Sequence, residues 1–208
     1  MTSEDATERM SRMLNTAIAK SFLSIFRCGS WVILNFSLLF AEAESGGEER
    51  GEMGGVVGKG VYVLILEISR ETVVEIGRAR RRIRFKRGFY AYVGSALSGL
   101  EHRIQRHLRS SQGETKKKHW HIDFLLASPA VRIVAIILAQ TEERKECEIA
   151  SHLLRNGLEF VRGFGCSDCG CESHLFFSPQ QSALLSAVRS SFIASGLSPS
   201  VVRAAVSS

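Results

Sequence analysis

Runs of apolar residues, continuous or alternating with polar ones, predict a series of strands in the central part of the chain. The first run is continuous and rich in β-branched residues, a pattern typical of a buried strand. A later run alternates, with Tyr90 and Tyr92 on one face and three apolar residues on the other, which is the period of a half-buried strand. The short connections predict antiparallel neighbours. The predicted strands are residues 61–66, 72–76, 82–86, 89–93 and 131–138, with shorter candidates at 160–161 and 175–177.

A spacing of three to four residues between apolar positions predicts a helix directly after the alternating strand. Leu100, Ile104 and Leu108 form one stripe at about 100° per residue, suited to packing on a sheet. Arg103 and His107 are four residues apart along the edge of that stripe, and we expect both to face the margin of the sheet. A guanidinium and an imidazole at that margin are suited to binding a phosphate.

Three further helices are predicted in the second half of the chain. Residues 120–126 predict a short helix, and Thr141 is the predicted N-cap of a helix that continues to Gly157 at its C-terminal end. After Ser178, spaced apolar residues predict one amphipathic helix followed by a disordered tail. Together the elements predict an α+β fold, a mostly antiparallel β-sheet flanked by helices.

The first 58 residues differ from the rest and predict an extension outside the folded core. Residues 22–41 are apolar but interrupted by Arg27, which makes the run marginal for a transmembrane helix. We rank a non-core extension first, a membrane-associating helix second and a cleaved signal peptide third. Residues 42–58 are rich in Gly and Glu and predict a flexible linker. A membrane is therefore not an expected partner. The predicted organisation is an extension and linker over 1–58, a domain over 59–178, and a helix and tail over 179–208.

Basic residues are concentrated on either side of the predicted helix with Arg103. The chain has 208 residues, of which 45% are hydrophobic, enough for one sizeable core, and a net charge of +6. Residues 78–87 are rich in Arg, and residues 116–118 are all Lys. Nucleic acid is the expected partner, and the alternative is that these runs are only solvated. The candidate nucleic-acid contacts are Arg82, Arg84, Arg106, Lys116, Lys117, Lys118 and His119.

Three of the five cysteines lie close together and are followed by a histidine. Cys166, Cys169, Cys171 and His174 give the pattern C-x2-C-x-C-x2-H. Thiolates and an imidazole in this number suit a tetrahedral Zn²⁺ ion, so these four residues are candidate zinc ligands. The alternatives are a packed turn with small buried thiols and a redox-responsive cluster. The odd number and close spacing of the cysteines argue against ordinary disulfides and favour a reducing cytoplasm.

Five ordered segments are similar to those of a known family. They are residues 60–62 (GVY), 92–94 (YVG), the pair Arg103 and His107, residues 119–123 (HWHID) and residues 164–174 (FGCSDCGCESH). Together they resemble the core of the GIY-YIG nucleases, and the last two resemble more narrowly a branch of largely uncharacterised proteins. The resemblance covers residues 59–178. The long interval between GVY and YVG indicates an inserted hairpin that contains the Arg-rich strand.

The resemblance implies a site for hydrolysing phosphodiester bonds. Tyr62 would act as general base or would organise the attacking water, Tyr92 would support it, and Arg103 would stabilise the scissile phosphate. Because a phenol with a pKa of about 10 is a poor base, a nearby cation such as Arg103 or a metal would have to lower the pKa of Tyr62. His107 would orient the water or the leaving group. Taken singly, each residue has a structural alternative. A tyrosine in a strand can serve only in packing, and Arg103 and His107 can form a solvated helix edge.

A Mg²⁺ ligand is also implied by the resemblance. Residues 146–150 (ECEIA) are similar to the metal-binding segment of these nucleases, which makes Glu146 the candidate ligand and Glu148 the alternative. Carboxylate oxygens suit this hard ion. The chain departs from many members of the family because it lacks a Pro-x-x-Asn after this helix.

The first hypothesis is a metal-dependent endonuclease that acts on DNA phosphodiester bonds, with Mg²⁺ as cofactor. DNA-repair proteins are further expected partners, and the cytoplasm is the expected location. One alternative is a non-catalytic nucleic-acid-binding module on the same fold. Another is a metal-sensing or redox-sensing protein built around residues 166–174.

Overall fold

The computed structural model describes residues 58–77, 79–115 and 117–203. The predictions made for residues 1–57 and for Lys116 lie outside these residues. The described part of the chain confirms the predicted α+β fold, with a six-stranded, mostly antiparallel sheet flanked by helices. None of the helices in this part is long and apolar enough to cross a membrane.

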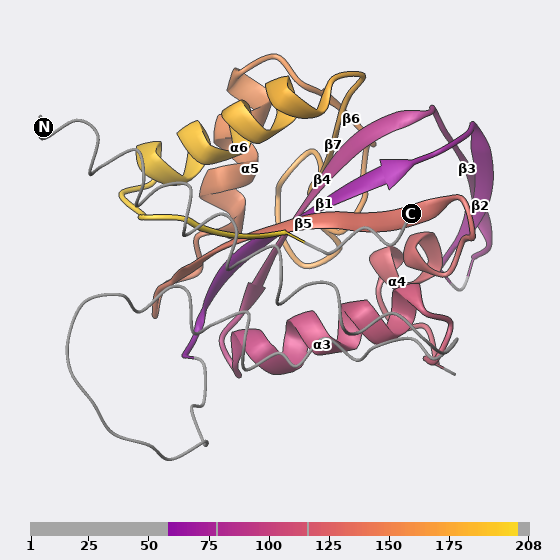
Figure 1. Ribbon diagram of the computed structural model, residues 1–208, viewed down its shortest axis with the longest axis horizontal. Helices are drawn as coiled ribbons and strands as arrows, with labels where there is room; N and C mark the ends of the chain where they lie inside the picture. The colour runs from indigo at the N-terminus through magenta and orange to yellow at the C-terminus, as the bar shows by residue number, and fades with distance from the viewer. Residues whose placement is uncertain (1–57, 78, 116, 204–208) are drawn as a thin grey trace, which may run out of the picture. The chain divides into compact units, whose positions relative to one another are not determined.

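The main sheet is built from six strands that pair antiparallel throughout. They are β1 (Gly60–Ile68), β4 (Gly88–Ala96), β5 (Val131–Gln140), β6 (Glu159–Phe160), β7 (Leu175–Ser178) and β8 (Ser200–Arg203). The order across the sheet is β6-β7-β4-β1-β5-β8, and Figure 1 shows the three long strands at its centre. β1 therefore has a strand on each side and helices above and below, which explains its continuous apolar run.

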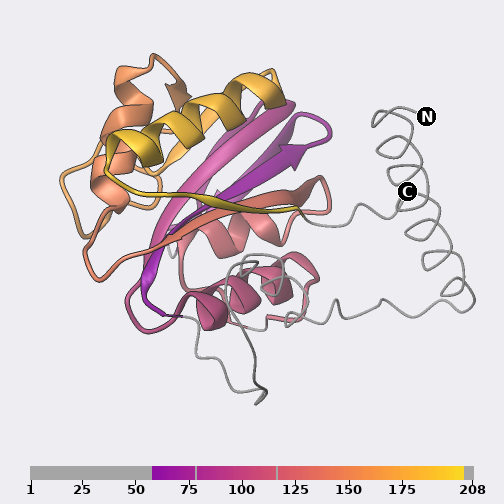
Figure 2. The same cartoon turned by 60° about the vertical axis from the view of Figure 1, so that its left-hand side comes forward.

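Helices cover both faces of the sheet, as Figures 1 and 2 show. They are α3 (Leu100–Ser111) and α4 (His121–Leu126) on one face, and α5 (Glu146–Arg155) and α6 (Gln181–Ala194) on the other. Alternate side chains of β1 therefore enter two different cores. Val61 and Val63 pack in one cluster with Ile149 and Phe192 of the α5–α6 layer. The intervening side chains, including Tyr62, face α3 and α4.

The insertion between β1 and β4 is a separate two-stranded sheet of β2 (Thr72–Ile76) and β3 (Arg81–Phe85). The structure thus confirms the predicted inserted hairpin with its Arg-rich strand. The hairpin packs against α4 and lies at the right of Figure 1. Phe85 is fully buried and makes edge contacts with Tyr90 and Phe164. These contacts join the hairpin to β4 and to the loop that contains the cysteines.

Three predicted boundaries are wrong. α5 begins at Glu146 rather than after Thr141. The Thr141 N–H donates to the Lys59 carbonyl (3.0 Å), which continues the β1–β5 pairing, and its hydroxyl accepts the Glu143 N–H in a turn (3.1 Å). β4 continues to Ala96 instead of breaking at its glycine, because β1 pairs with it to that point. The expected disordered tail contains β8, which pairs with β5.

Candidate active site

The motif residues meet at one end of the sheet, where β1 begins and β4 ends. Tyr62 lies opposite Gly94, and Leu64 lies opposite Tyr92, so both tyrosines are on the same face of the sheet. A Cβ atom on Gly94 would lie 2.6 Å from the Tyr62 hydroxyl oxygen, closer than real atoms approach. Glycine at this position therefore makes room for the Tyr62 ring, which explains why the two motifs belong together.

Tyr62 and His107 form a buried hydrogen-bonded pair between β1 and α3. The Tyr62 hydroxyl oxygen and His107 Nε2 are 2.7 Å apart, and each residue is 1% exposed. Burial lowers the pKa of His107 to about 4, opposed by Asp123 and reinforced by Arg103 and Arg106. His107 is therefore neutral at neutral pH. His107 was predicted at the margin of the sheet, but it is buried between α3 and the sheet.

The surroundings of the two tyrosines keep them protonated. Burial raises the pKa of Tyr62 well above its ordinary value; Tyr92 and Glu146 raise it further, while Arg103 lowers it. Burial also raises the pKa of Tyr92, again opposed by Arg103. Arg103 thus lowers the pKa of Tyr62, as predicted, but without a bound ligand the effect of burial is larger and the pKa stays raised. Tyr62 is therefore a neutral phenol at neutral pH.

Trp120 positions two arginines of α3. The guanidinium carbon of Arg103 is 4.3 Å from the centroid of the Trp120 ring, and that of Arg106 is 4.1 Å away, which is cation–π geometry. Arg103 is half-buried and forms no ion pair with another residue in the described part of the chain. Its charge is therefore available to an anion at this end of the sheet.

Asp123 is a positioning residue to which the sequence pattern assigned no role. Its side chain is fully buried, and its Oδ2 atom accepts hydrogen bonds from the Arg106 side chain (2.6 Å) and from the backbone N–H groups of His119 (2.8 Å) and Trp120 (3.0 Å). These bonds fix the start of α4 to α3. The available signal was an acidic residue three positions after the helix N-cap. Arg106, predicted to contact nucleic acid, is partly exposed and pairs with Asp123.

Glu146 brings a carboxylate to the same site from the other helix layer. It is the first residue of α5, and its Oε2 atom is buried without a hydrogen-bond partner among the described residues. Burial raises the pKa of Tyr62 and the charge of Glu146 adds to this rise, whereas burial lowers the pKa of His174 and the charge of Glu146 opposes that change. The alternative ligand, Glu148, is paired with Lys145 (2.9 Å), which lowers the pKa of Glu148. Glu146 is therefore the carboxylate of the first turn of α5 that has no counter-charge among the described residues.

Three of the four predicted zinc ligands converge, and a residue from another segment takes the fourth place. The sulfur atoms of Cys147, Cys169 and Cys171 and a ring nitrogen of His174 all lie within 4.8 Å of one another. Cys166 is outside this cluster, so the predicted set is wrong in that member. Cys147 belongs to α5, and its proximity to the loop arises from tertiary packing that spacing within the loop cannot show. The cluster could hold a metal ion such as zinc.

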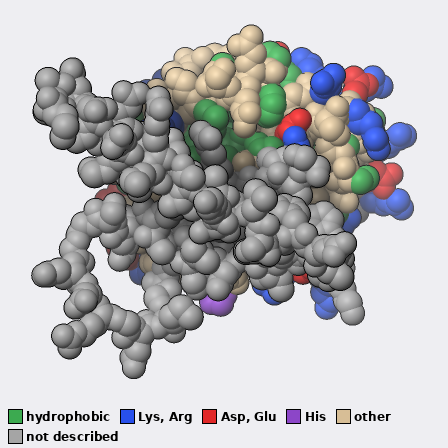
Figure 3. All heavy atoms as spheres, viewed as in Figure 1, with side chains coloured by type: hydrophobic (Ala, Val, Ile, Leu, Met, Phe, Trp, Pro, Cys, Tyr) green, Lys and Arg blue, Asp and Glu red, His purple; other side chains and the backbone are tan. Residues whose placement is uncertain are grey.

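The Arg-rich strand forms a charged surface on the hairpin. Figure 3 shows Lys and Arg side chains gathered along that edge, with Asp and Glu among them. Arg82 and Arg84 are exposed, and Arg84 pairs with Glu71 (3.1 Å). Lys117 and Lys118 are also exposed, on the segment before α4. The surface is therefore accessible to a polyanion, although acidic side chains neutralise part of its charge.

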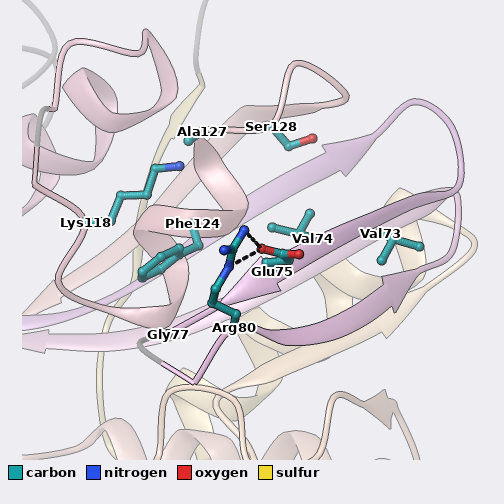
Figure 4. Close-up of a pocket in the computed structure, with 9 residues that line it drawn as sticks. All are labelled: Val73, Val74, Glu75, Gly77, Arg80, Lys118, Phe124, Ala127 and Ser128. Atoms are coloured by element: carbon teal, nitrogen blue, oxygen red, sulfur yellow. Dashed lines mark hydrogen bonds and ion pairs between the residues drawn. The ribbon is translucent and has the colours of Figure 1, made fainter.

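A cavity of about 390 Å³ lies between the hairpin and α4, and Figure 4 shows the side chains around it. Within it, Arg80 pairs with Glu75 at 2.7 Å. Its lining residues are Val73, Val74, Glu75, Gly77, Arg80, Lys118, Phe124, Ala127 and Ser128. None of the candidate catalytic residues lines this cavity, so it is separate from the Tyr62–His107 pair at the end of the sheet.

A family model described as "Domain of unknown function DUF123" matches residues 61–196. The matched region runs from β1 into the segment after α6, so it includes both helix layers and the whole cysteine loop. Searches of curated proteins and of solved structures found no match to the chain.

Proposed function

The chain belongs to the DUF123 family, which is GIY-YIG-like, and we propose that it is a Mg²⁺-dependent endonuclease that hydrolyses phosphodiester bonds in DNA. The observation that supports this most is the buried 2.7 Å hydrogen bond between Tyr62 and His107, together with a buried, unpartnered Oε2 atom of Glu146 whose charge acts on the pKa of Tyr62. Arg103 adds a positive charge at the same place. A carboxylate, a phenol, an imidazole and a guanidinium are the groups that hydrolysis of a phosphodiester can use.

Glu146 would hold the Mg²⁺ ion together with oxygens of the bound phosphate. When bound, Mg²⁺ would neutralise the negative charge that develops on the phosphate. Glu146 is the better ligand of the two candidates because Lys145 pairs with Glu148 and leaves Glu146 without a counter-charge from that lysine.

Arg103 would bind the scissile phosphate. Its guanidinium is stacked near Trp120, which limits its motion while its N–H groups remain able to donate to phosphate oxygens. Charge-assisted hydrogen bonds of this kind are stronger than neutral ones, and they strengthen as negative charge grows in the transition state. The role of Trp120 is to position this guanidinium.

Tyr62 and His107 would handle the proton of the attacking water. A neutral phenol can take a proton from water only if it passes its own proton on, and His107 Nε2 lies 2.7 Å from the Tyr62 hydroxyl oxygen. Burial keeps His107 neutral at neutral pH, so Nε2 can accept in the tautomer with hydrogen on Nδ1. The negative charge of a bound phosphate would raise the pKa of His107 and favour this transfer.

The exposed basic residues of the hairpin and of the segment before α4 are the proposed contacts for the DNA backbone. Phosphate contacts give affinity without reading sequence, which agrees with a surface of Arg and Lys side chains. Roles in DNA repair and in the cytoplasm are proposed on the resemblance. The cysteines of the described part of the chain are free thiols, which supports a reducing compartment.

A second candidate function is a nucleic-acid-binding module without turnover. Burial raises the pKa of Tyr62 and lowers that of His107, so neither group is an effective base in the protein alone. A sensing protein built on the thiol cluster is a third candidate. It predicts that thiol alkylation changes the main activity while Tyr62→Phe does not.

Cleavage of labelled duplex, branched and single-stranded DNA by the full chain, with Mg²⁺ or with EDTA, tests the proposal. Tyr62→Phe removes the hydroxyl that contacts His107. Tyr90→Phe is the matched control, because the Tyr90 hydroxyl donates to the Lys86 carbonyl (3.1 Å) away from the site. Metal-dependent products that fall about 100-fold in Tyr62→Phe but not in Tyr90→Phe would support the nuclease. Binding of the DNAs without any products would favour the binding module.

A further inference from the structure

We propose that Cys147, Cys169, Cys171 and His174 bind one structural Zn²⁺ ion, and that this ion fixes the first turn of α5 so that Glu146 stays at the nuclease site. The zinc site stands on its own geometry. Its effect on Glu146 rests on the proposed nuclease function.

The distances between the ligand atoms match a tetrahedral zinc site. Zn–S bonds of about 2.3 Å and Zn–N bonds of about 2.1 Å put a sulfur and a nitrogen ligand about 3.6 Å apart, and two sulfur ligands about 3.8 Å apart. His174 Nε2 lies 3.5 Å from Cys169 Sγ and 3.9 Å from Cys147 Sγ. With all four atoms within 4.8 Å of one another, shifts of about 1 Å are enough to surround an ion.

The chemistry of the four ligands selects zinc rather than Mg²⁺. Thiolates and imidazole suit Zn²⁺, whereas Mg²⁺ requires oxygen ligands and near-octahedral geometry. Four protein ligands complete a tetrahedral shell and leave no position for substrate, which is typical of structural zinc. The proposed zinc therefore does not replace the Mg²⁺ of the cleavage reaction.

The loop that presents three of the ligands is built by its own hydrogen bonds. The Gly163 N–H donates to the Glu172 carbonyl (2.8 Å), and the His174 N–H donates to the Phe164 carbonyl (2.8 Å). The Val93 N–H donates to the His174 carbonyl (2.9 Å), which ties the loop to β4. Backbone bonds thus hold the loop ligands in place, and the fourth ligand is the one that couples the loop to a different element.

That fourth ligand, Cys147, lies in the first turn of α5 next to Glu146. The N-cap residue of this helix, Lys145, makes no side-chain capping bond, so the helix start lacks a common means of stabilisation. Binding of Cys147 to zinc would anchor the turn to the loop. Glu146 and Cys147 are consecutive residues in the first turn of α5, so movement of this turn would move Glu146 relative to the sheet that holds Tyr62.

The zinc content of the full chain, purified under reducing conditions and incubated with ZnCl₂, tests the site directly. We expect one zinc per chain by mass spectrometry of the metal. Cys147→Ala should lose this zinc, and Cys166→Ala should keep it because Cys166 lies outside the cluster. The reverse pattern would overturn the ligand set, and a wild-type chain without zinc would overturn the site.

Substitution with Co²⁺ keeps the test decisive even if Cys147→Ala does not fold. The wild-type protein and Cys166→Ala should both show the strong visible absorption of tetrahedral Co²⁺ and the near-ultraviolet bands of thiolate-to-cobalt charge transfer. A weak octahedral spectrum from wild type, or bands that disappear in Cys166→Ala, would contradict the proposed site.

The effect on Glu146 is measured by the Mg²⁺ dependence of DNA cleavage. Removing zinc with a zinc-selective chelator should raise the Mg²⁺ concentration for half-maximal rate about 10-fold, and adding Zn²⁺ back should restore it. A folded, zinc-depleted chain with unchanged Mg²⁺ dependence would overturn the effect on Glu146 and leave the zinc site intact. If the zinc-loaded chain cleaves no DNA, the proposed function fails, together with its link to zinc, while the metal content still decides the zinc site.

Discussion

The helices α3 and α5 bring polar groups to the same end of the sheet, but these groups are partnered in different ways. On α3, His107 and Arg106 each have a buried partner, and Arg103 packs on an aromatic ring. On α5, Glu146 Oε2 has no hydrogen-bond partner among the described residues, and Cys147 faces thiols and an imidazole. Unpartnered buried atoms occur on both sides, because Arg106 Nε, His107 Nδ1 and Asp123 Oδ1 also lack a partner among the described residues. The difference is that each α3 group has at least one protein contact, whereas the α5 groups include a carboxylate without a counter-charge and a thiol in the metal-ligand cluster. Substitutions on the two sides should therefore have different effects on cleavage, stability and metal content.

Arg103→Gln should have the largest effect on the α3 side, because Arg103 is the half-buried arginine stacked near Trp120 whose charge remains available to substrate. We expect the cleavage rate to fall about 1000-fold, the loss typical of removing a donor to a developing oxyanion, while DNA affinity changes little. Arg109→Gln is the matched control, since Arg109 is exposed on the same helix. Single-turnover cleavage and DNA-binding titrations measure both effects. An equal loss in Arg109→Gln would show that general charge, not position, matters.

Asp123→Ala should remove the brace of the α3 side and lower stability. Arg106 would be left without its partner, and two backbone N–H groups would lose their acceptor, which we expect to lower the free energy of unfolding by about 3 kcal/mol. Urea denaturation measures this change. Arg84→Gln, which breaks an exposed ion pair with Glu71, should cost less than about 1 kcal/mol. Similar costs for the two variants would contradict the structural role of Asp123.

The buried imidazole of His107 should make the α3 side sensitive to acid. Burial lowers the pKa of His107 to about 4, below its value of about 6.5 in the unfolded chain. Between these two pKa values the unfolded chain binds more protons than the folded chain. The stability contributed by neutral, buried His107 is therefore present at neutral pH and is lost as the pH falls from about 6.5 toward 4. Between pH 7 and 5, wild type should lose about 2 kcal/mol more than His107→Gln. Identical pH dependence in the two proteins would mean that His107 is not buried in its neutral form.

Gly94→Ala should perturb Tyr62 without affecting α5. The added Cβ would lie 2.6 Å from the Tyr62 hydroxyl oxygen, so the ring must shift away from His107 at a cost of about 1.5 kcal/mol. Gly58→Ala is the control, because a Cβ there meets no atom within 4 Å. Thermal unfolding and zinc content measure the two sides separately. Loss of zinc in Gly94→Ala would show that the two sides are not independent.

The two sides also differ in how far the sequence predicted them. The period of two in the alternating strand placed Tyr90 and Tyr92 on one face, and the GVY and YVG motifs placed Tyr62 and Gly94 in the same site, as the strand register shows. The first feature follows from the local period of the strand. The second follows from the close approach of the Tyr62 ring, which leaves room only for glycine at position 94. The brace by Asp123 was missed because its partner lies on another helix.

The α5 side depends on contacts between distant segments, which local patterns do not reveal. Thr141 has the residue type of an N-cap, but its backbone is held by Lys59 and the helix starts later. Cys147 completes the thiol cluster in place of Cys166 because α5 packs near the loop. Similarly, the pairing of β8 with β5 turns an expected tail into an edge strand. In each case a contact between distant segments decided the outcome.

Comparison of Glu146→Gln with Glu148→Gln tests the proposed site most directly. Both residues lie in the first turn of α5, but Glu148 is paired with Lys145 and Glu146 is not. In single-turnover cleavage of DNA with Mg²⁺, we expect Glu146→Gln to lower the rate about 1000-fold and Glu148→Gln to stay within about 3-fold of wild type, with one zinc per chain in both. A Glu146→Gln protein that cleaves at the wild-type rate would contradict the assignment of this carboxylate to catalysis.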